Sequence, residues 1–104
     1  MTAVLDSSAL PILEGALDFA CMGLCPEGMY RNRHFAEEHV KVMPGVSREM
    51  LDVMFDPQTS GGLLIAVSEE EGLKMLEEMK ATVPMARMIG RVEAARSDCS
   101  IIVG

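Results

Sequence analysis

Tryptophan is absent from this sequence, and aromatic residues make up only 4% of its 104 residues. Positive charge is also scarce, since nine Lys and Arg stand against sixteen Asp and Glu, which gives a formal net charge of −7. Nucleic-acid phosphates are bound by clustered Lys and Arg. The charge balance therefore argues against a nucleic-acid-binding protein.

Long apolar runs are missing too. No run approaches the ~18 residues of a membrane-spanning helix, so we expect no membrane span. The first residues, MTAVLDSSALP, lack a basic segment followed by a long apolar one, so no secretory signal is visible. Three cysteines form an odd number without the spacing of a disulfide framework. This usage is typical of a reducing compartment, and we expect a cytoplasmic protein.

What the sequence does contain is an excess of apolar residues. They make up 49% of the chain and include ten methionines, and the mean hydropathy is +0.22. A single small domain has too little interior to bury so many apolar side chains. We therefore expect part of the surface to be covered by a missing segment, another domain or a second copy.

Hydrophobic spacing and capping residues predict an α+β or α/β fold, with helices packed on a mixed sheet. Helices are expected over 10–24, with Gly15 in the interior, over 47–54, capped by Ser47, and over 68–81. Ser68 and Glu71 form a capping-box pair at the start of the last helix. Strands are expected over 2–5, 63–67, 86–92 and 100–104, and residues 25–35 are expected to form a loop.

Cysteine and histidine give one candidate metal pattern. Cys21, Cys25, His34 and His39 are spaced C-x3-C-x8-H-x4-H, but the middle spacer is shorter than that of a zinc finger. Cys21 also falls on the apolar face of a predicted helix, where a buried thiol is the ordinary interpretation. We expect no metal site. A nucleophilic Cys25 is not favoured either, because nothing brings a histidine and a carboxylate to it.

The segment Asp56-Pro57-Gln58-Thr59-Ser60-Gly61-Gly62 is the strongest candidate for function. It is not a Walker loop, because no lysine follows the glycines and an apolar run comes next. Two interpretations remain open. The Thr, Ser and Gly residues can present backbone amides to an anion, or the glycines can let the backbone pass close to another domain. The apolar run that follows favours the second.

The only dense basic cluster is Arg31 and Arg33 around Asn32. These residues are candidate contacts to an anionic ligand. The alternative is that they are ordinary exposed surface residues.

The chain resembles the C-terminal part of selenophosphate synthetase (selenide, water dikinase). The resemblance rests on the string DPQTSGGLLIAV and on Leu-Pro-x-Leu-x-Gly-Ala at Leu10 to Ala16. It also rests on Pro-x-Gly-x-x-Arg-Asn at Pro26 to Asn32 and on the tail that ends in IGRV. It extends from about residue 3 to the end of the chain.

The resemblance implies an enzyme that converts ATP, selenide and water into selenophosphate, AMP and phosphate with Mg²⁺. It implies a three-layer α/β/α domain with a mixed sheet, partly ferredoxin-like and similar to the C-terminal domain of aminoimidazole ribonucleotide synthetase. The partners it implies are the enzyme's own N-terminal ATP-binding domain and a second subunit in a homodimer.

The family's catalytic cysteine or selenocysteine, its lysine and its magnesium-binding aspartates belong to the N-terminal domain and have no counterpart here. We therefore expect residues 1–104 to be a single C-terminal domain fragment with no catalytic residue and no ATP or Mg²⁺ of its own. Residues 56 and 58–62 are expected to form a wall of the active-site cleft. The alternatives are the same domain of another enzyme in the superfamily and a stand-alone module that binds a small ligand.

Overall fold

The computed structural model describes residues 1–104 and is built around a four-stranded mixed β-sheet. The strands are β1 (Thr2–Leu5), β2 (Val40–Val42), β3 (Gly90–Glu93) and β4 (Ile101–Val103), in the spatial order β2-β4-β1-β3. β4 runs parallel to both β1 and β2, whereas β3 is antiparallel to β1. The predicted α+β class with a mixed sheet is confirmed.

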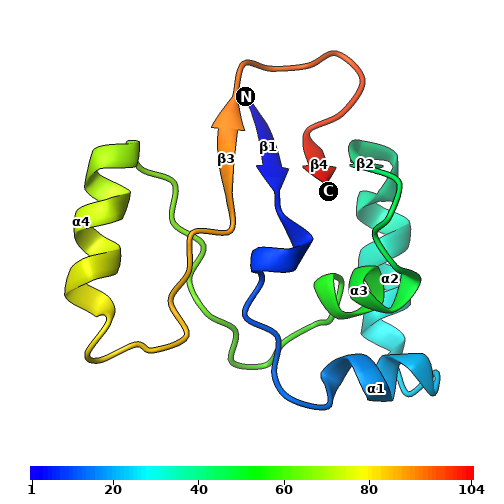
Figure 1. Ribbon diagram of the computed structural model, residues 1–104. Coiled ribbons are helices and arrows are strands. Elements are labelled where there is room, and N and C mark those ends of the chain that lie inside the picture. Colours follow the sequence, from blue (N-terminus) through cyan, green and yellow to red (C-terminus); the bar gives the residue numbers. More distant parts are fainter.

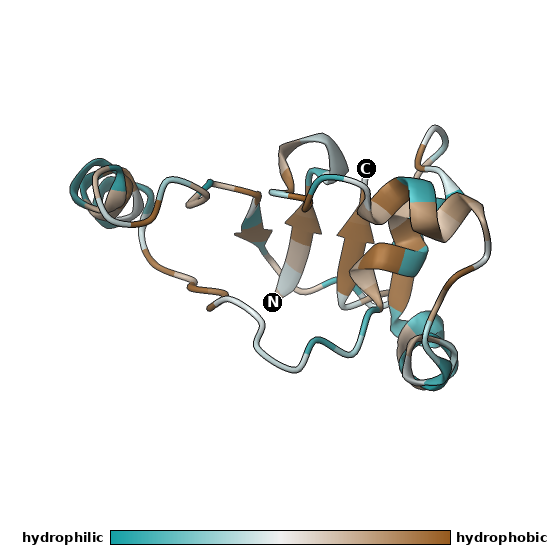
Figure 2. Ribbon diagram, turned by 90° about the horizontal axis from the view of Figure 1, so that it is seen from below, coloured by the Kyte–Doolittle hydropathy of each residue, from teal (hydrophilic) through white to brown (hydrophobic).

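Four α-helices flank this sheet: α1 (Ala16–Cys21), α2 (Glu27–Ala36), α3 (Arg48–Met54) and α4 (Glu69–Met79). There are also two short 3-10 helices. η1 (Ser7–Ala9) lies between β1 and α1, and η2 (Glu37–His39) lies between α2 and β2. α1 packs mainly on α3. Both views place α1, α2 and α3 on the β2 side of the sheet, whereas α4 stands apart beyond β3 (Figures 1 and 2).

Capping residues determine where several elements begin, and these predictions are confirmed. The Ser47 hydroxyl accepts a hydrogen bond from the Met50 amide over 3.2 Å at the start of α3. The Ser68 hydroxyl accepts from the Glu71 amide over 3.4 Å and donates to the Glu71 carboxylate over 2.7 Å. Both caps satisfy amides that the first turn of a helix leaves without a partner.

The helix predicted over 10–24 is much shorter, since α1 covers only Ala16–Cys21. Gly15 was expected inside the helix, but it is the residue before its first turn and has a φ of +82°. Backbone in this left-handed region favours glycine because it has no Cβ atom. Gly15 therefore allows the helix to begin where it does.

The loop predicted over 25–35 is wrong, because Glu27–Ala36 form the ten-residue helix α2. Pro26 and Gly28 suggested a loop. Pro26 is instead the N-cap in extended conformation, and Glu27 provides negative charge in the first turn. Gly28 lies against Pro57, where an added Cβ would stand 2.6 Å from Pro57 Cγ. A close contact between segments distant in sequence therefore explains this glycine.

The strand predicted over 63–67 is also wrong. Residues 61–67 form no secondary structure, and no backbone hydrogen bond joins residues 63–67 to another part of the chain. The side chains are exposed: 91% for Leu63, 76% for Leu64 and 48% for Val67. An apolar run is compatible with a strand, but a strand needs a neighbour to pair with. In this chain the segment has none.

The strand predicted over 86–92 begins only at Gly90. There β3 lies so close to β1 that an added Cβ would stand 2.1 Å from the Val4 carbonyl oxygen. The last predicted strand is confirmed by β4, and strand β2 lies in a region where the sequence showed no clear period.

The core is small and centres on the two middle strands, which are apolar along most of their length (Figure 2). Only seven residues are buried, among them Met29, Ile102 and Val103. The accessible surface is 7717 Å², whereas a globular monomer of 11.3 kDa exposes about 5,700 Å². The difference supports the expectation that the apolar composition exceeds what this chain buries by itself.

Candidate functional site

The predicted loop over residues 56–62 follows α3 and forms one side of a cavity of about 580 Å³. Asp56, Gln58, Thr59 and Ser60 line this cavity together with residues of α1 and of the segment that precedes it. The fold therefore brings four of the six predicted loop residues to one surface. The other lining residues come from three regions of the chain: Pro11, Ile12, Leu13, Ala16, Phe19, Ala20, Leu24, Cys25, Pro26, Asp52 and Val53.

Gly61 and Gly62 lie beyond the cavity lining. Neither has a positive φ. A Cβ added to Gly62 would meet nothing within 4 Å, and one added to Gly61 would meet only the side chain of Gln58, at 2.7 Å. No contact within this chain therefore requires a glycine at position 62. At position 61 the nearest atom is the terminal oxygen of the flexible Gln58 side chain, which can move aside.

The predicted anion contacts Arg31, Asn32 and Arg33 lie on α2, but they point in different directions. Arg31 is exposed and lies 3.8 Å from the Glu27 carboxylate, one turn earlier. The Arg33 guanidinium forms an ion pair with Asp52 of α3. Asn32 Nδ2 donates to the backbone carbonyl oxygen of Phe55 over 2.9 Å. Asn32 and Arg33 are thus engaged with α3 and its C-cap residue, whereas Arg31 pairs only with an exposed residue of its own helix.

The charge lining the cavity is negative. It contains the carboxylates of Asp52 and Asp56 and no Lys or Arg side chain. Asp52 is buried and is neutralised from outside the lining by Arg33, with Arg48 Nε 3.9 Å from its other oxygen. A phosphate group entering this cavity would gain no cation from the lining. The chemistry present is apolar surface with hydroxyl, amide and carboxylate groups.

Cysteine and histidine do not gather into a metal centre. No group of three or more His, Cys, Asp or Glu side chains is arranged to hold a metal ion. Cys25 lines the cavity, whereas Cys21 is exposed and Cys99 is buried. Burial raises the pKa of the Cys99 thiol, and the nearby Asp98 carboxylate adds to this rise. Cys99 therefore remains a thiol at neutral pH and is a poor nucleophile.

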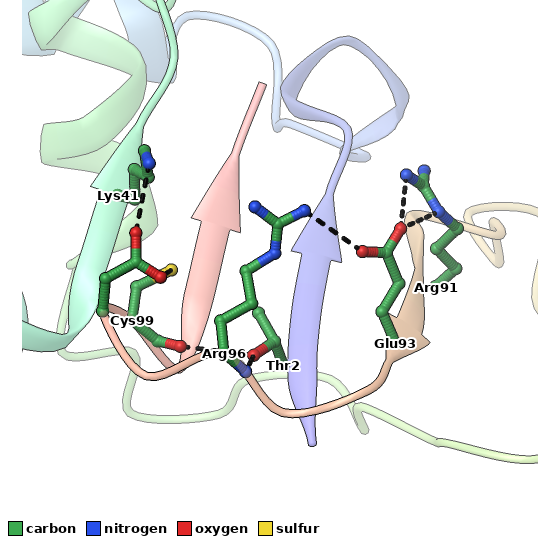
Figure 3. Close-up of polar contacts among 7 residues, drawn as sticks. Thr2, Lys41, Arg91, Glu93, Arg96 and Cys99 are labelled. Carbon is green, nitrogen blue, oxygen red and sulfur yellow. Dashed lines mark hydrogen bonds and ion pairs between the residues drawn. The ribbon is translucent and has the colours of Figure 1, made fainter.

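A second polar cluster lies at the end of the sheet where β1 begins and β3 ends (Figure 3). The sequence did not indicate this cluster. The Thr2 hydroxyl is fully buried, donates to the Cys99 carbonyl oxygen over 3.2 Å and accepts from the Arg96 amide over 2.9 Å. Glu93 lies between Arg91 at 2.7 Å and Arg96 at 3.6 Å. Only the tertiary fold brings residue 2 to residues 96–99, so no local pattern could have revealed this cluster.

Lys41 of β2 completes the cluster by pairing with Asp98 at 3.2 Å (Figure 3). The hydrogen bond from Lys41 lowers the pKa of the Asp98 carboxyl group. The side chains of this pair are about half exposed. The cluster therefore holds residues 94–100, which connect β3 to β4, against the sheet. It provides no enclosed site for a ligand.

Comparison with known proteins gives one consistent result. The chain is 43% identical over 91 residues to the selenide, water dikinase of Clostridium botulinum (strain Eklund 17B / Type B), which covers 88% of this chain. The chain is similar over most of its length to one part of this selenide, water dikinase. The match covers 26% of the relative, so the chain spans about a quarter of the length of that protein.

Two further selenide, water dikinases show the same similarity. Selenide, water dikinase 2 of Peptoclostridium acidaminophilum is 38% identical over 104 residues, 99% of this chain and 29% of the relative. The enzyme of Nitratidesulfovibrio vulgaris (strain DSM 19637 / Miyazaki F) is 52% identical over 71 residues, 68% of this chain and 20% of the relative. No family model matches the chain. No helix is both long and apolar enough to cross a membrane.

Proposed function

We propose that this chain is the C-terminal domain of a cytoplasmic selenophosphate synthetase, which converts ATP, selenide and water into selenophosphate, AMP and phosphate. The observation that carries the proposal is the 43% identity to a selenide, water dikinase over 88% of the chain. Catalytic groups, ATP and Mg²⁺ then belong to the N-terminal domain. The role of this domain is to complete the wall of the active-site cleft.

The geometry of the loop supports this role. Residues 57–62 are all exposed, and Thr59 and Ser60, which carry hydroxyl groups, line a cavity. Gly62 lies in open space, so a close contact with a neighbouring domain provides the reason for glycine there. The six residues Asp56, Gln58, Thr59, Ser60, Gly61 and Gly62 therefore form the proposed inter-domain or phosphate-side surface, with the exposed Arg31 as a candidate contact to an anion.

The residues present do not fit a magnesium ion, because no three metal-binding side chains converge. The cavity lining also offers no cation to the phosphates of ATP. No reaction step is therefore assigned to a metal or nucleotide bound by this chain alone. In the proposed enzyme, the cation that neutralises the phosphates comes from the N-terminal domain.

The apolar surface supports a covering partner. Leu63, Leu64 and Val67 are about half to almost fully exposed, and the accessible surface exceeds that of a compact monomer by roughly 2,000 Å². This excess is of the size buried in a stable protein interface. We propose that the N-terminal domain covers it within a homodimeric enzyme.

The test is the activity of a full-length polypeptide that ends in this chain. We expect ATP- and selenide-dependent formation of selenophosphate by the full-length protein and none by residues 1–104 alone. Thr59→Ala combined with Ser60→Ala should lower turnover or ATP affinity, whereas Thr82→Ala, an exposed threonine of another segment, should not. Absence of selenophosphate from the full-length protein would contradict the proposed activity. Unchanged kinetics of the double variant would contradict the role of the loop.

A further inference from the structure

Helix α2 holds the C-terminal end of α3 at the point where the candidate loop begins. Gly28 and Asn32 are four residues apart, so they lie on one face of α2. Gly28 packs against Pro57, and Asn32 Nδ2 donates to the Phe55 carbonyl oxygen over 2.9 Å. Both contacts fall within two residues of Asp56, the first residue of the loop.

Arg33 forms a third contact of α2 with α3. Its guanidinium pairs with the Asp52 carboxylate, which is buried, and its Cζ lies 5.7 Å from the centroid of the Phe55 ring. A planar guanidinium can bind a carboxylate and stack near an aromatic ring at the same time. Arg33 therefore contacts two positions separated by almost one turn at the end of α3.

The end of a helix needs such contacts. The last four carbonyl groups of an α-helix have no partner within the helix, and Phe55 is the C-cap residue of α3. Asn32 supplies a donor to one of these carbonyl groups, and the positive charge of Arg33 is favourable near the negative end of the helix dipole. The direction in which the chain leaves α3 is thus fixed by side chains of another helix.

We propose that Asn32 and Arg33 are positioning residues, which fix the exit of the chain from α3 and thereby place Gln58, Thr59 and Ser60 at the cleft. The catalytic consequence rests on the proposed function, whereas the structural consequence does not. This role differs from the direct anion contact expected of these two residues from the sequence.

The experiment uses the full-length protein and two readouts. The first is amide hydrogen exchange at Phe55, Asp56 and Gln58, whose amides donate to backbone carbonyls in the last turn of α3 and in the two residues after it. The second is kcat/KM for ATP in selenophosphate formation. The variants are Arg33→Met and Arg33→Lys, and the matched control is Lys74→Met, which removes an exposed ion pair with Glu70 on α4.

Arg33→Met should accelerate exchange at these three amides about tenfold, because a hydrogen bond to a charged group and its local stabilisation are lost. The amides of Ala3 and Gly104, which bond within the sheet, should keep their rates. kcat/KM should fall in the same variant, while Arg33→Lys should give intermediate values and Lys74→Met wild-type values.

Equal acceleration at Ala3 and Gly104 would overturn the proposal, because it would show a general loss of stability. Unchanged exchange at the end of α3 would also overturn it. If Arg33→Met fails to fold, Arg33→Lys supplies the same comparison. If the wild-type protein forms no selenophosphate, the proposed function fails, and the exchange rates still decide whether Arg33 positions the loop.

Discussion

Thr2 and Cys99 lie at opposite ends of the sequence, yet the Thr2 hydroxyl donates to the Cys99 carbonyl oxygen over 3.2 Å. The same hydroxyl accepts from the Arg96 amide, so a single buried side chain satisfies two backbone groups of the 94–100 connection. The Thr2 side chain therefore joins β1 to the connection between β3 and β4, in addition to the β-ladders that pair β1 with both strands.

Thr2→Val should destabilise the chain by about 1–3 kcal/mol, because it leaves the Arg96 amide and the Cys99 carbonyl without this hydrogen-bond partner while keeping the side-chain volume. Urea unfolding measures this change. Thr82→Val is the matched control, since the Thr82 hydroxyl makes only an exposed hydrogen bond of 3.5 Å. A loss of stability as large in the Thr82 variant would contradict this account.

Lys41→Met should raise the pKa of Asp98, because the hydrogen bond from Lys41 is the largest cause of its lowered value. Folding favours the carboxylate, so this contribution to stability is present above the ordinary Asp pKa of about 3.9 and is lost as the pH falls through the lowered value. Titration of the side-chain carboxyl carbons by NMR measures the shift. Asp6 is the control, since hydrogen bonds from Ser8 are the main cause of its lowered pKa.

Gly28→Ala should destabilise the chain by about 1–3 kcal/mol, because the new Cβ would overlap Pro57 and push α2 away from the end of α3. Gly62→Ala should leave the stability of the chain unchanged or raise it by up to about 1 kcal/mol, since it has room and no positive φ. Thermal unfolding of both variants makes the comparison.

In the full-length protein the same Gly62→Ala substitution should reduce activity, since the proposed inter-domain contact leaves no space for a side chain. Full activity of this variant would show that Gly62 does not face another domain closely.

Leu64→Lys should reduce self-association of residues 1–104 and their binding of an apolar dye, because Leu64 belongs to the exposed apolar segment. Sedimentation velocity over a range of concentrations measures the association. Met22→Lys is a suitable control, since Met22 is similarly exposed, at 70%, but lies outside that segment. An equal effect of both substitutions would point to net charge as the cause.

Ser68→Ala should weaken α4 by about 1 kcal/mol, because its hydroxyl caps the first turn. Ser68→Asp should retain most of the cap. Amide exchange in α4 measures the loss, and exchange in β1 and β4 should remain unchanged, since the principal contacts between elements do not involve α4. Faster exchange throughout the sheet would contradict this independence.

Elements with a strong local signal could be predicted from the sequence. Ser47 and Ser68 mark the starts of α3 and α4 because a capping hydroxyl acts within its own first turn. Gly28 gave a misleading signal, because its small size serves a contact with Pro57, 29 positions later in the sequence. The strand predicted over residues 63–67 was wrong for a related reason. Apolar and β-branched residues favour a strand, but whether a neighbouring strand is available for pairing depends on the whole fold.

The sequence indicated the residues of the candidate loop, and their function stays a prediction. The Asp-Pro-Gln-Thr-Ser string identified the loop, and four of its residues line the cavity. The cluster of Arg31, Asn32 and Arg33 could be found in the sequence, but the contacts of each side chain could not. Position on α2 decides that Arg33 pairs with Asp52, whereas Arg31 is exposed. Thr2 carried no signal, since its partners lie more than ninety residues away.

The strand order has a consequence for the folding pathway. β1 pairs only with β3 and β4, in which Leu5 meets Gly90 and Ala3 meets Ile101. β1 is made before β3 and β4, so it cannot pair until residues 90–103 have been synthesised, and such distant pairings slow folding. During that delay α2, α3 and α4 can form from local interactions, while the apolar residues of β1 remain open to chaperones and to other chains.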